Sequence, residues 1–208
     1  MKLEEYGRFT VIMRGYSFEQ ADRIIEVLCE YKDDFVVEIT LNSEGALDTI
    51  RRLTHTYKNR IHIGAGTVKT LYDAENAVAA GAEFLLSPIG FTKEMMDYCK
   101  EKGVIAIPAA MTPSEIETQF HLGADIVKVF PARTVGAKFF KDVQAPLGKL
   151  KLMAVGGVGM GNYQEYFDND CQYVGMGSGM FGALDINTAS DDQLRSVFES
   201  YLDGKEKK

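Results

Sequence analysis

A lysine stands in the middle of an apolar segment, ADIVKVFPA, which spans residues 124–132. The isoleucine and valines around Lys128 are typical of a parallel strand that is covered on both faces. An ammonium group buried there must be paired, solvated or neutral, because burying it alone is costly. A free lysine has a pKa of about 10.4 and is almost wholly protonated at pH 7. Apolar neighbours such as Ile126 and Phe130 would lower the pKa of Lys128 and make it a nucleophile able to form a Schiff base.

A carboxylate occupies the matching position in another apolar segment, VVEITLN, which begins at residue 36. Side chains alternate along a strand, so Glu38 shares a face with Val36 and Thr40. Lys128 shares a face with Ile126 and Phe130 for the same reason. Two interpretations are open if both side chains point inward. Glu38 and Lys128 form a buried ion pair with a structural role, or the carboxylate moves protons for an amine nucleophile.

Eight apolar segments recur along the chain, each followed by a helical pattern. They begin at residues 9, 36, 61, 84, 104, 126, 151 and 173. Eight strand–helix units predict a small (β/α)8 TIM barrel, with residues 1–208 as a single domain. A doubly wound open sheet is the alternative. Closure is favoured by the count of eight, by the absence of a single glycine fingerprint after the first strand, and by polar residues at the ends of many strands.

Helix starts are marked by three capping patterns. SFEQ at 17–20, TPSE at 112–115 and NYQE at 162–165 each place a cap residue three positions before Glu or Gln. We therefore expect Ser17, Thr112 and Asn162 to cap the helices that follow them.

Two glycine-rich runs follow the last two predicted strands, VGGVGMGN after the seventh and GMGSGMFG after the eighth. In (β/α)8 enzymes these two loops often hold a phosphate group through backbone N–H groups. Tight turns that require positive φ are the structural alternative. The occurrence of both runs favours a phosphate site, which we assign to Gly156, Gly157, Gly177 and Ser178.

Three further segments end predicted strands. GAGT at 64–67 has glycines that allow a ligand to approach the backbone, and Thr67 offers a hydroxyl group. SPIG at 87–90 and IPAAMTP at 107–113 place Pro88 and Pro108 where they would shape the rim of the barrel.

The composition argues against some classes of binding partner. The net charge of −7 argues against nucleic acid or an anionic membrane as the main partner, but an anionic metabolite needs only a local basic pocket. No apolar run approaches the roughly 20 residues of a membrane span. The first ten residues, MKLEEYGRFT, lack the apolar core of a signal peptide, so we expect a cytoplasmic protein.

Cysteine and histidine give no sign of a metal or redox centre. The three cysteines (Cys29, Cys99, Cys171) are far apart and are expected to be reduced thiols. The three histidines are isolated, without metal-ligand spacing. We therefore expect no metal and no cofactor. The C-terminal DGKEKK is expected to be a solvated end without a function.

The sequence resembles the 2-keto-3-deoxy-6-phosphogluconate and 4-hydroxy-2-oxoglutarate aldolases, class I enzymes on a small (β/α)8 barrel. The most specific matches are EITL at 38–41, GAGTV at 64–68, VKVFPA at 127–132 and the glycine pair at 156–157. The resemblance implies that Lys128 is the Schiff-base lysine and Glu38 the proton shuttle.

The same resemblance implies the substrate contacts. Arg14 would lie near the substrate carboxylate, Thr67, Pro88 and Phe130 would line the site, and the glycine loops would hold the phosphate. It also implies a homotrimer, and a phosphorylated keto acid and pyruvate as small-molecule partners.

Three positions depart from the gluconate-type pattern. Asn42 stands where an arginine is usual, Val155 replaces a threonine, and Ala109 follows Pro108 where a glycine is often found. LNS at 41–43 and AVGGV at 154–158 are closer to the 2-dehydro-3-deoxy-6-phosphogalactonate aldolases. The expected reaction is cleavage of a 2-keto-3-deoxy-6-phospho sugar acid, of gluconate or galactonate type, to pyruvate and glyceraldehyde 3-phosphate. A phosphate-binding epimerase or decarboxylase, and a non-catalytic barrel that binds a phosphorylated metabolite, are the alternatives.

Overall fold

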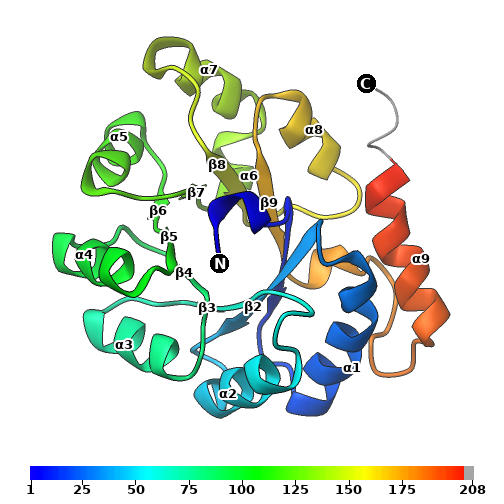
Figure 1. Ribbon diagram of the computed structural model, residues 1–208. Helices are drawn as coiled ribbons and strands as arrows, with labels where there is room; N and C mark the ends of the chain where they lie inside the picture. The colour runs from blue at the N-terminus through cyan, green and yellow to red at the C-terminus, as the bar shows by residue number, and fades with distance from the viewer. Residues whose placement is uncertain (204–208) are drawn as a thin grey trace.

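Strands and helices alternate along the chain in the computed structural model, which describes residues 1–203 (Figure 1). The strands are β1 (Phe9–Met13), β2 (Phe35–Thr40), β3 (Ile63–Gly66), β4 (Phe84–Leu86), β5 (Ile105–Ile107), β6 (Ala109–Ala110), β7 (Val127–Val129), β8 (Leu152–Val155) and β9 (Tyr173–Met176). The α-helices are α1 (Phe18–Leu28), α2 (Ala46–Thr56), α3 (Leu71–Ala79), α4 (Lys93–Lys102), α5 (Pro113–Leu122), α6 (Ala132–Val135), α7 (Lys138–Leu147), α8 (Tyr163–Asp168) and α9 (Asp191–Leu202). Short 3-10 helices are η1 (Leu3–Glu5), η2 (Cys29–Tyr31) and η3 (Ser178–Met180).

The nine strand segments form one parallel sheet in the order β5-β4-β3-β2-β1-β9-β8-β7-β6. The two outermost segments, β5 and β6, are consecutive in the chain and are separated only by Pro108. The carbonyl of Pro108 accepts a hydrogen bond of 2.8 Å from the backbone N–H of Lys128. β5 and β6 together therefore act as one barrel strand, which pairs with β4 on one side and β7 on the other. The predicted (β/α)8 barrel is confirmed. Its fifth strand is divided in two because proline has no N–H to donate.

Apolar side chains form two layers. One layer lies between the strands and the surrounding helices, and it includes Val127 and Val129. The other fills the barrel interior, with Val36, Phe84 and Ile126 among its members. This division follows from the alternation of side chains along each strand.

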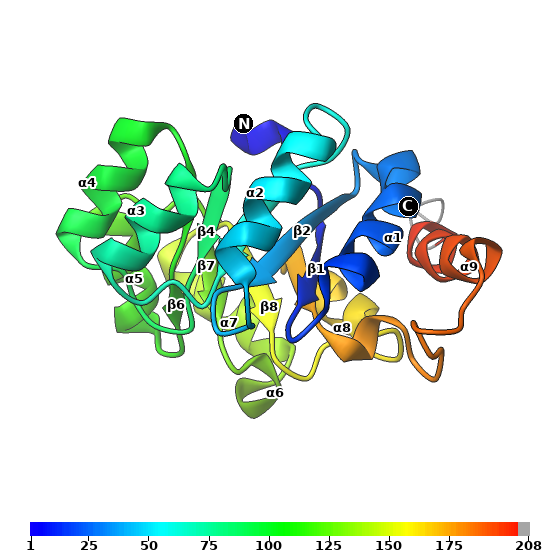
Figure 2. The ribbon, with the colours of Figure 1, turned by 90° about the horizontal axis from the view of Figure 1, so that it is seen from below.

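The amino-terminal segment closes one end of the barrel. Tyr6 belongs to the interior cluster, and Met1 and Leu3 pack against it. Figure 2 shows this segment at one end of the molecule and α6 at the opposite end. The carboxyl ends of the strands, where (β/α)8 enzymes place their sites, therefore lie at the end that α6 marks.

Two of the three predicted helix caps are confirmed. Ser17 caps α1 by accepting a hydrogen bond from the backbone of Gln20, and Thr112 caps α5 in the same way, with Pro113 as the first helical residue. The third prediction was wrong, because the side chain of Asn162 makes no cap bond to α8. Its amide serves the preceding loop: Oδ1 accepts from the backbone N–H of Gly159 and Nδ2 donates to the carbonyl of Gly157, both at 2.9 Å.

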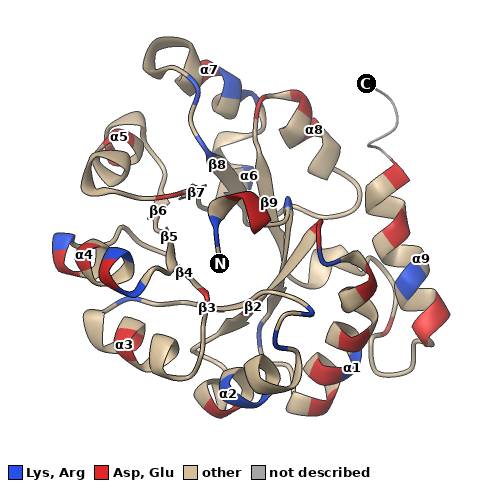
Figure 3. Ribbon diagram, viewed as in Figure 1, with Lys and Arg blue, Asp and Glu red and all other residues tan. Residues whose placement is uncertain are grey.

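Charged residues lie mainly on the outer helices and loops, and the strands carry few (Figure 3). None of the helices within residues 1–203 has the length and apolar character needed to cross a bilayer. All three cysteines are free. The tail from residue 204 onward, for which a solvated end was predicted, lies outside the described residues.

Candidate active site

Lys128 and Glu38 point into the barrel from opposite sides. Lys128 lies on β7 and Glu38 on β2, and four steps around the ring separate these strands in either direction. Both side chains are buried, with exposed fractions of 5% and 2%. The neighbours of Lys128 along the strand face the helices, which leaves the lysine on the inner face, as the alternation predicted.

Burial disfavours the charged form of each group. It lowers the pKa of the Lys128 ammonium, against the attraction of Glu38 and with the added repulsion of Arg14. Burial also raises the pKa of the Glu38 carboxyl, against the attraction of Lys128 and Arg14. Within the part of the chain that the structure describes, the two groups form no salt bridge shorter than 4.0 Å. A structural ion pair therefore accounts for the arrangement of Lys128 and Glu38 less well than a desolvated amine and a desolvated acid that face each other across a gap.

One oxygen of the Glu38 carboxyl is buried without a hydrogen-bond partner in the described residues. Buried polar atoms are nearly always satisfied, and an orphan of this kind calls for an explanation. Glu38 Oε2 is consistent with a carboxyl group that exchanges a proton with a bound molecule.

The glycines of β3 make room for two side chains, where the sequence predicted a ligand close to the backbone. A Cβ atom on Gly66 would lie 1.4 Å from Glu38 Oε1, and one on Gly64 would lie 2.3 Å from the Phe84 ring. The absence of side chains at Gly66 and Gly64 lets the Glu38 carboxyl and the Phe84 ring come close to β3. The segment GAGT therefore positions the proposed acid–base group.

We expect Gly66→Ala to lower kcat of aldol cleavage by roughly 10²-fold or more, the contribution of a positioned acid–base group. The added methyl group occupies the place of the Glu38 carboxyl and forces it out of position. A steady-state assay of pyruvate release measures the effect.

Gly103→Ala is the matched control, because Gly103 at the end of α4 has φ +66 and no atom within 4 Å of its Cβ position. The strain there costs roughly 1 kcal/mol of stability without touching the barrel interior, so activity is expected to remain. A Gly66→Ala enzyme with normal kcat would show that the position of Glu38 does not matter.

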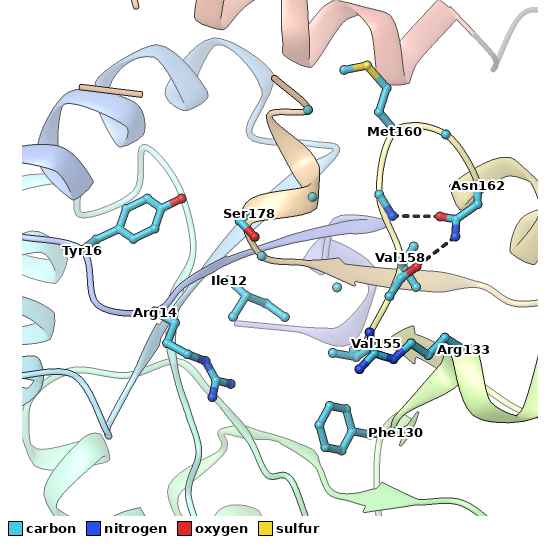
Figure 4. A pocket seen from close by; sticks show the side chains of 18 residues that line it. Ile12, Arg14, Tyr16, Phe130, Arg133, Val155, Val158, Met160, Asn162 and Ser178 are labelled. Carbon is cyan, nitrogen blue, oxygen red and sulfur yellow. Dashed lines mark hydrogen bonds between the residues drawn. The ribbon is translucent and has the colours of Figure 1, made fainter. Parts of the chain in front are cut away.

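Six of the predicted site residues line one cavity of about 920 Å³ at the carboxyl end of the barrel. They are Arg14, Phe130, Gly156, Gly157, Gly177 and Ser178. Figure 4 shows Arg14, Phe130 and Ser178 around this space. The amine of Lys128 lies 5.2 Å from the centre of the Phe130 ring, so Phe130 links the buried amine to the cavity.

Four predicted residues do not line this cavity, namely the buried pair Lys128 and Glu38, and Thr67 and Pro88. Pro88 lines a second cavity of about 450 Å³, which shares Phe130 with the first. Thr67 follows β3 with φ +61, a conformation that costs a β-branched residue of order 1–3 kcal/mol, and donates a hydrogen bond of 3.2 Å to Asn42. Thr67 thus holds the side chain of Asn42.

The loop that carries Arg14 is tied to the end of β2. The backbone N–H of Gly15 donates to the hydroxyl of Ser43 at 2.8 Å, and that hydroxyl is 2.9 Å from the hydroxyl of Thr40. These two bonds fix the chain where it leaves β1. The guanidinium of Arg14 is therefore presented to the cavity by a braced loop.

The cavity also has polar and charged lining residues that the sequence did not predict for the site, among them Tyr16, Arg133 and Asn162. Arg133 follows the lysine strand in FPART, at the carboxyl end of a barrel stave, and that placement could have marked it. Asn162 was assigned to a helix cap, which concealed its role in shaping the glycine loop.

Comparison with known proteins places these features in a family. Residues 7–197 match the family model described as KDPG and KHG aldolase. The chain belongs to this family. The resemblance seen in the sequence is confirmed.

Two relatives carry the two sugar-acid names. The 2-dehydro-3-deoxy-phosphogluconate aldolase of Treponema pallidum is 30% identical over 167 residues, which cover 80% of this chain and 79% of the relative. The 2-dehydro-3-deoxy-6-phosphogalactonate aldolase of Escherichia coli K12 is 28% identical over 191 residues, covering 91% and 92%.

The KDPG aldolase of Legionella pneumophila is a similar solved structure, with a TM-score of 0.81, 26% identity and 93% coverage of each chain. That structure holds pyruvate as a covalent carbinolamine intermediate. The KDPG aldolases are thus neighbours of this chain in fold as well as in sequence.

Proposed function

We propose that this protein is a class I aldolase that cleaves a 2-keto-3-deoxy-6-phospho sugar acid to pyruvate and glyceraldehyde 3-phosphate. The observation that carries the proposal is a buried amine opposite a buried carboxyl, beside a cavity with an arginine and two glycine loops, in a chain of the KDPG and KHG aldolase family. The same pair would serve a Schiff-base reaction in either sugar-acid series.

The reaction begins with an uncharged Lys128. Its amine adds to the C2 carbonyl carbon of the substrate and forms a carbinolamine, which loses water to give an iminium ion. Burial favours the uncharged amine, because it lowers the lysine pKa. Glu38 in its acid form protonates the leaving hydroxyl group during this dehydration.

Carbon–carbon cleavage follows. The C4 hydroxyl group loses its proton to the Glu38 carboxylate, directly or through a water molecule, and the C3–C4 bond breaks. Its electron pair moves into the iminium and leaves an enamine of pyruvate on Lys128, while C4 becomes the carbonyl carbon of glyceraldehyde 3-phosphate. Glu38 returns the proton to C3, and water hydrolyses the imine to release pyruvate.

Each end of the substrate has a proposed binding group. Arg14 binds the C1 carboxylate, since a planar guanidinium can form two parallel hydrogen bonds to it. The backbone N–H groups of Gly156, Gly157 and Gly177 and the hydroxyl of Ser178 bind the phosphate.

Phe130 and Pro88 line the space that the pyruvate half of the substrate would occupy. Thr67 holds Asn42 at the rim through their hydrogen bond. Asn42 and Val155 are the positions we expect to govern the choice between the gluconate and galactonate epimers, because both depart from the gluconate-type pattern.

The assembly and location follow the family resemblance. We propose a cytoplasmic homotrimer that acts on small phosphorylated keto acids and needs neither a metal nor an organic cofactor. Light scattering coupled to size-exclusion chromatography measures the assembly, and a mass of three chains is expected.

The function is tested by trapping and by turnover. The protein is incubated with pyruvate and borohydride, and its peptides are weighed; a stable pyruvyl adduct on Lys128 is expected. Cleavage of the two epimeric sugar-acid phosphates, followed through pyruvate release, then identifies the substrate. Phosphate binding without adduct or cleavage would indicate a binding protein, and loss of activity to a chelator would indicate a metal enzyme.

A further inference from the structure

Arg133 is a second guanidinium in the cavity. It lies in α6, immediately after the lysine strand, and its side chain is exposed. No hydrogen bond or ion pair joins its guanidinium to another side chain in the described part of the chain. Figure 4 shows Arg133 and Arg14 reaching into the cavity from two sides.

The glycine loop after β8 is built around Arg133. A Cβ atom on Gly157 would lie 2.7 Å from both Cβ and Cδ of Arg133, so the absence of a side chain there leaves room for the arginine stem. The backbone N–H of Arg133 also donates to the carbonyl of Gly156 at 3.0 Å. The arginine is thus packed against the two glycines to which we assign phosphate binding.

The charges of the cavity fit an anion with two charged ends. Its lining includes Arg14 and Arg133 and no aspartate or glutamate, in a chain whose net charge is −7. One guanidinium suffices for a keto-acid carboxylate. The second has no side-chain partner among residues 1–203 and lies on the side of the glycine loops.

We infer that Arg133 binds the phosphate group of the substrate and sets the preference for phosphorylated over unphosphorylated sugar acids. This inference rests on the proposed aldolase function. A guanidinium can form two parallel hydrogen bonds to phosphate oxygens, which the backbone N–H groups of the loops supplement. Arg133 is therefore a specificity residue that acts at the end of the substrate remote from the reacting carbons.

The test compares wild type with Arg133→Gln and Arg133→Lys on two substrates: the phosphorylated keto-deoxy sugar acid, and the same sugar acid without phosphate. Arg133→Gln is expected to raise KM for the phosphorylated substrate about 10- to 100-fold, with kcat changed less than threefold, because a charge-assisted bond is lost. Arg133→Lys keeps the positive charge but lacks the paired N–H donors of a guanidinium, so its KM is expected to lie between those of wild type and Arg133→Gln. Cleavage of the unphosphorylated substrate remains as in wild type.

Lys138→Gln is the matched control, because it removes the same charge from an exposed residue at the start of α7, outside the cavity. It is expected to leave both substrates unaffected. Equal losses on both substrates in Arg133→Gln, or no loss on either, would overturn the inference. If wild type cleaves neither substrate, the proposed function itself fails, and that outcome is distinct from a failure of Arg133.

Discussion

Lys128→Met is expected to lower kcat of aldol cleavage by at least roughly 10⁴-fold, because it removes the proposed imine-forming amine, which belongs to the one buried lysine among residues 1–203. Methionine resembles lysine in length and lacks the amine, so the interior of the barrel remains filled. Borohydride trapping with pyruvate should leave the variant unlabelled. Pyruvate release and the mass of the trapped protein measure the two effects.

Lys128→Arg separates the nucleophile from the charge. Arginine remains protonated in proteins and cannot attack a carbonyl carbon, so this variant is expected to be as inactive as Lys128→Met. Lys149→Met, on an exposed residue between α7 and β8, serves as the control and should keep full activity. Activity in Lys128→Arg would mean that the position supplies only positive charge, and that the imine mechanism is wrong.

The lysine also sets a pH limit. A free lysine amine would lose reactivity below pH about 10.4, where it becomes protonated. Burial lowers the pKa of Lys128, so the acid limb of kcat/KM should lie at lower pH than that of a free amine. Activity falls as pH falls through the lowered pKa, because the ammonium form is no nucleophile.

Alternation along strands made the inward-facing pair of Lys128 and Glu38 predictable from the sequence. Lys128 and Glu38 are charged residues within apolar runs, and a count of eight runs put their strands across the ring from each other. A two-residue period and a closed sheet fix both direction and distance around the barrel, so no tertiary contact had to be known.

The remaining features depend on contacts between segments far apart in the chain. Gly66 is required by Glu38 from a different strand, and the Asn162 amide is used by the loop before it instead of the helix after it. Thr67 has positive φ and donates a hydrogen bond to Asn42, and a sequence motif shows neither feature. The stem of Arg133, in the short helix α6, packs where Gly157 has no side chain.

Glu38→Gln is expected to lower kcat by roughly 10²- to 10⁴-fold, the range for loss of a positioned acid–base group. The amide cannot accept the C4 hydroxyl proton or return one to C3. Lys128 is still present, so borohydride should trap pyruvate on it, at a lower rate because dehydration of the carbinolamine loses its acid. Single-turnover measurements of adduct formation and of cleavage separate the two steps.

The same variant is expected to be more stable than wild type at neutral pH. Burial raises the pKa of Glu38 in the folded protein above its unfolded value of about 4.3. Below that value both states hold the proton and the penalty is absent; as pH rises through the folded pKa, the unfolded state gains by ionising and wild type loses stability. Glutamine does not titrate, so the variant avoids this loss.

Urea unfolding at pH 7.5 and near pH 4 tests the sign of this effect. The midpoint of Glu38→Gln should exceed that of wild type at pH 7.5, and the difference should shrink toward the acidic end. Glu75→Gln, which removes the same charge from an exposed position on α3, should show neither the kinetic loss nor the pH-dependent gain. A carboxyl group that serves function in a barrel core is expected to lower stability and to be required for turnover. A less stable and fully active Glu38→Gln would instead make Glu38 a structural partner of Lys128.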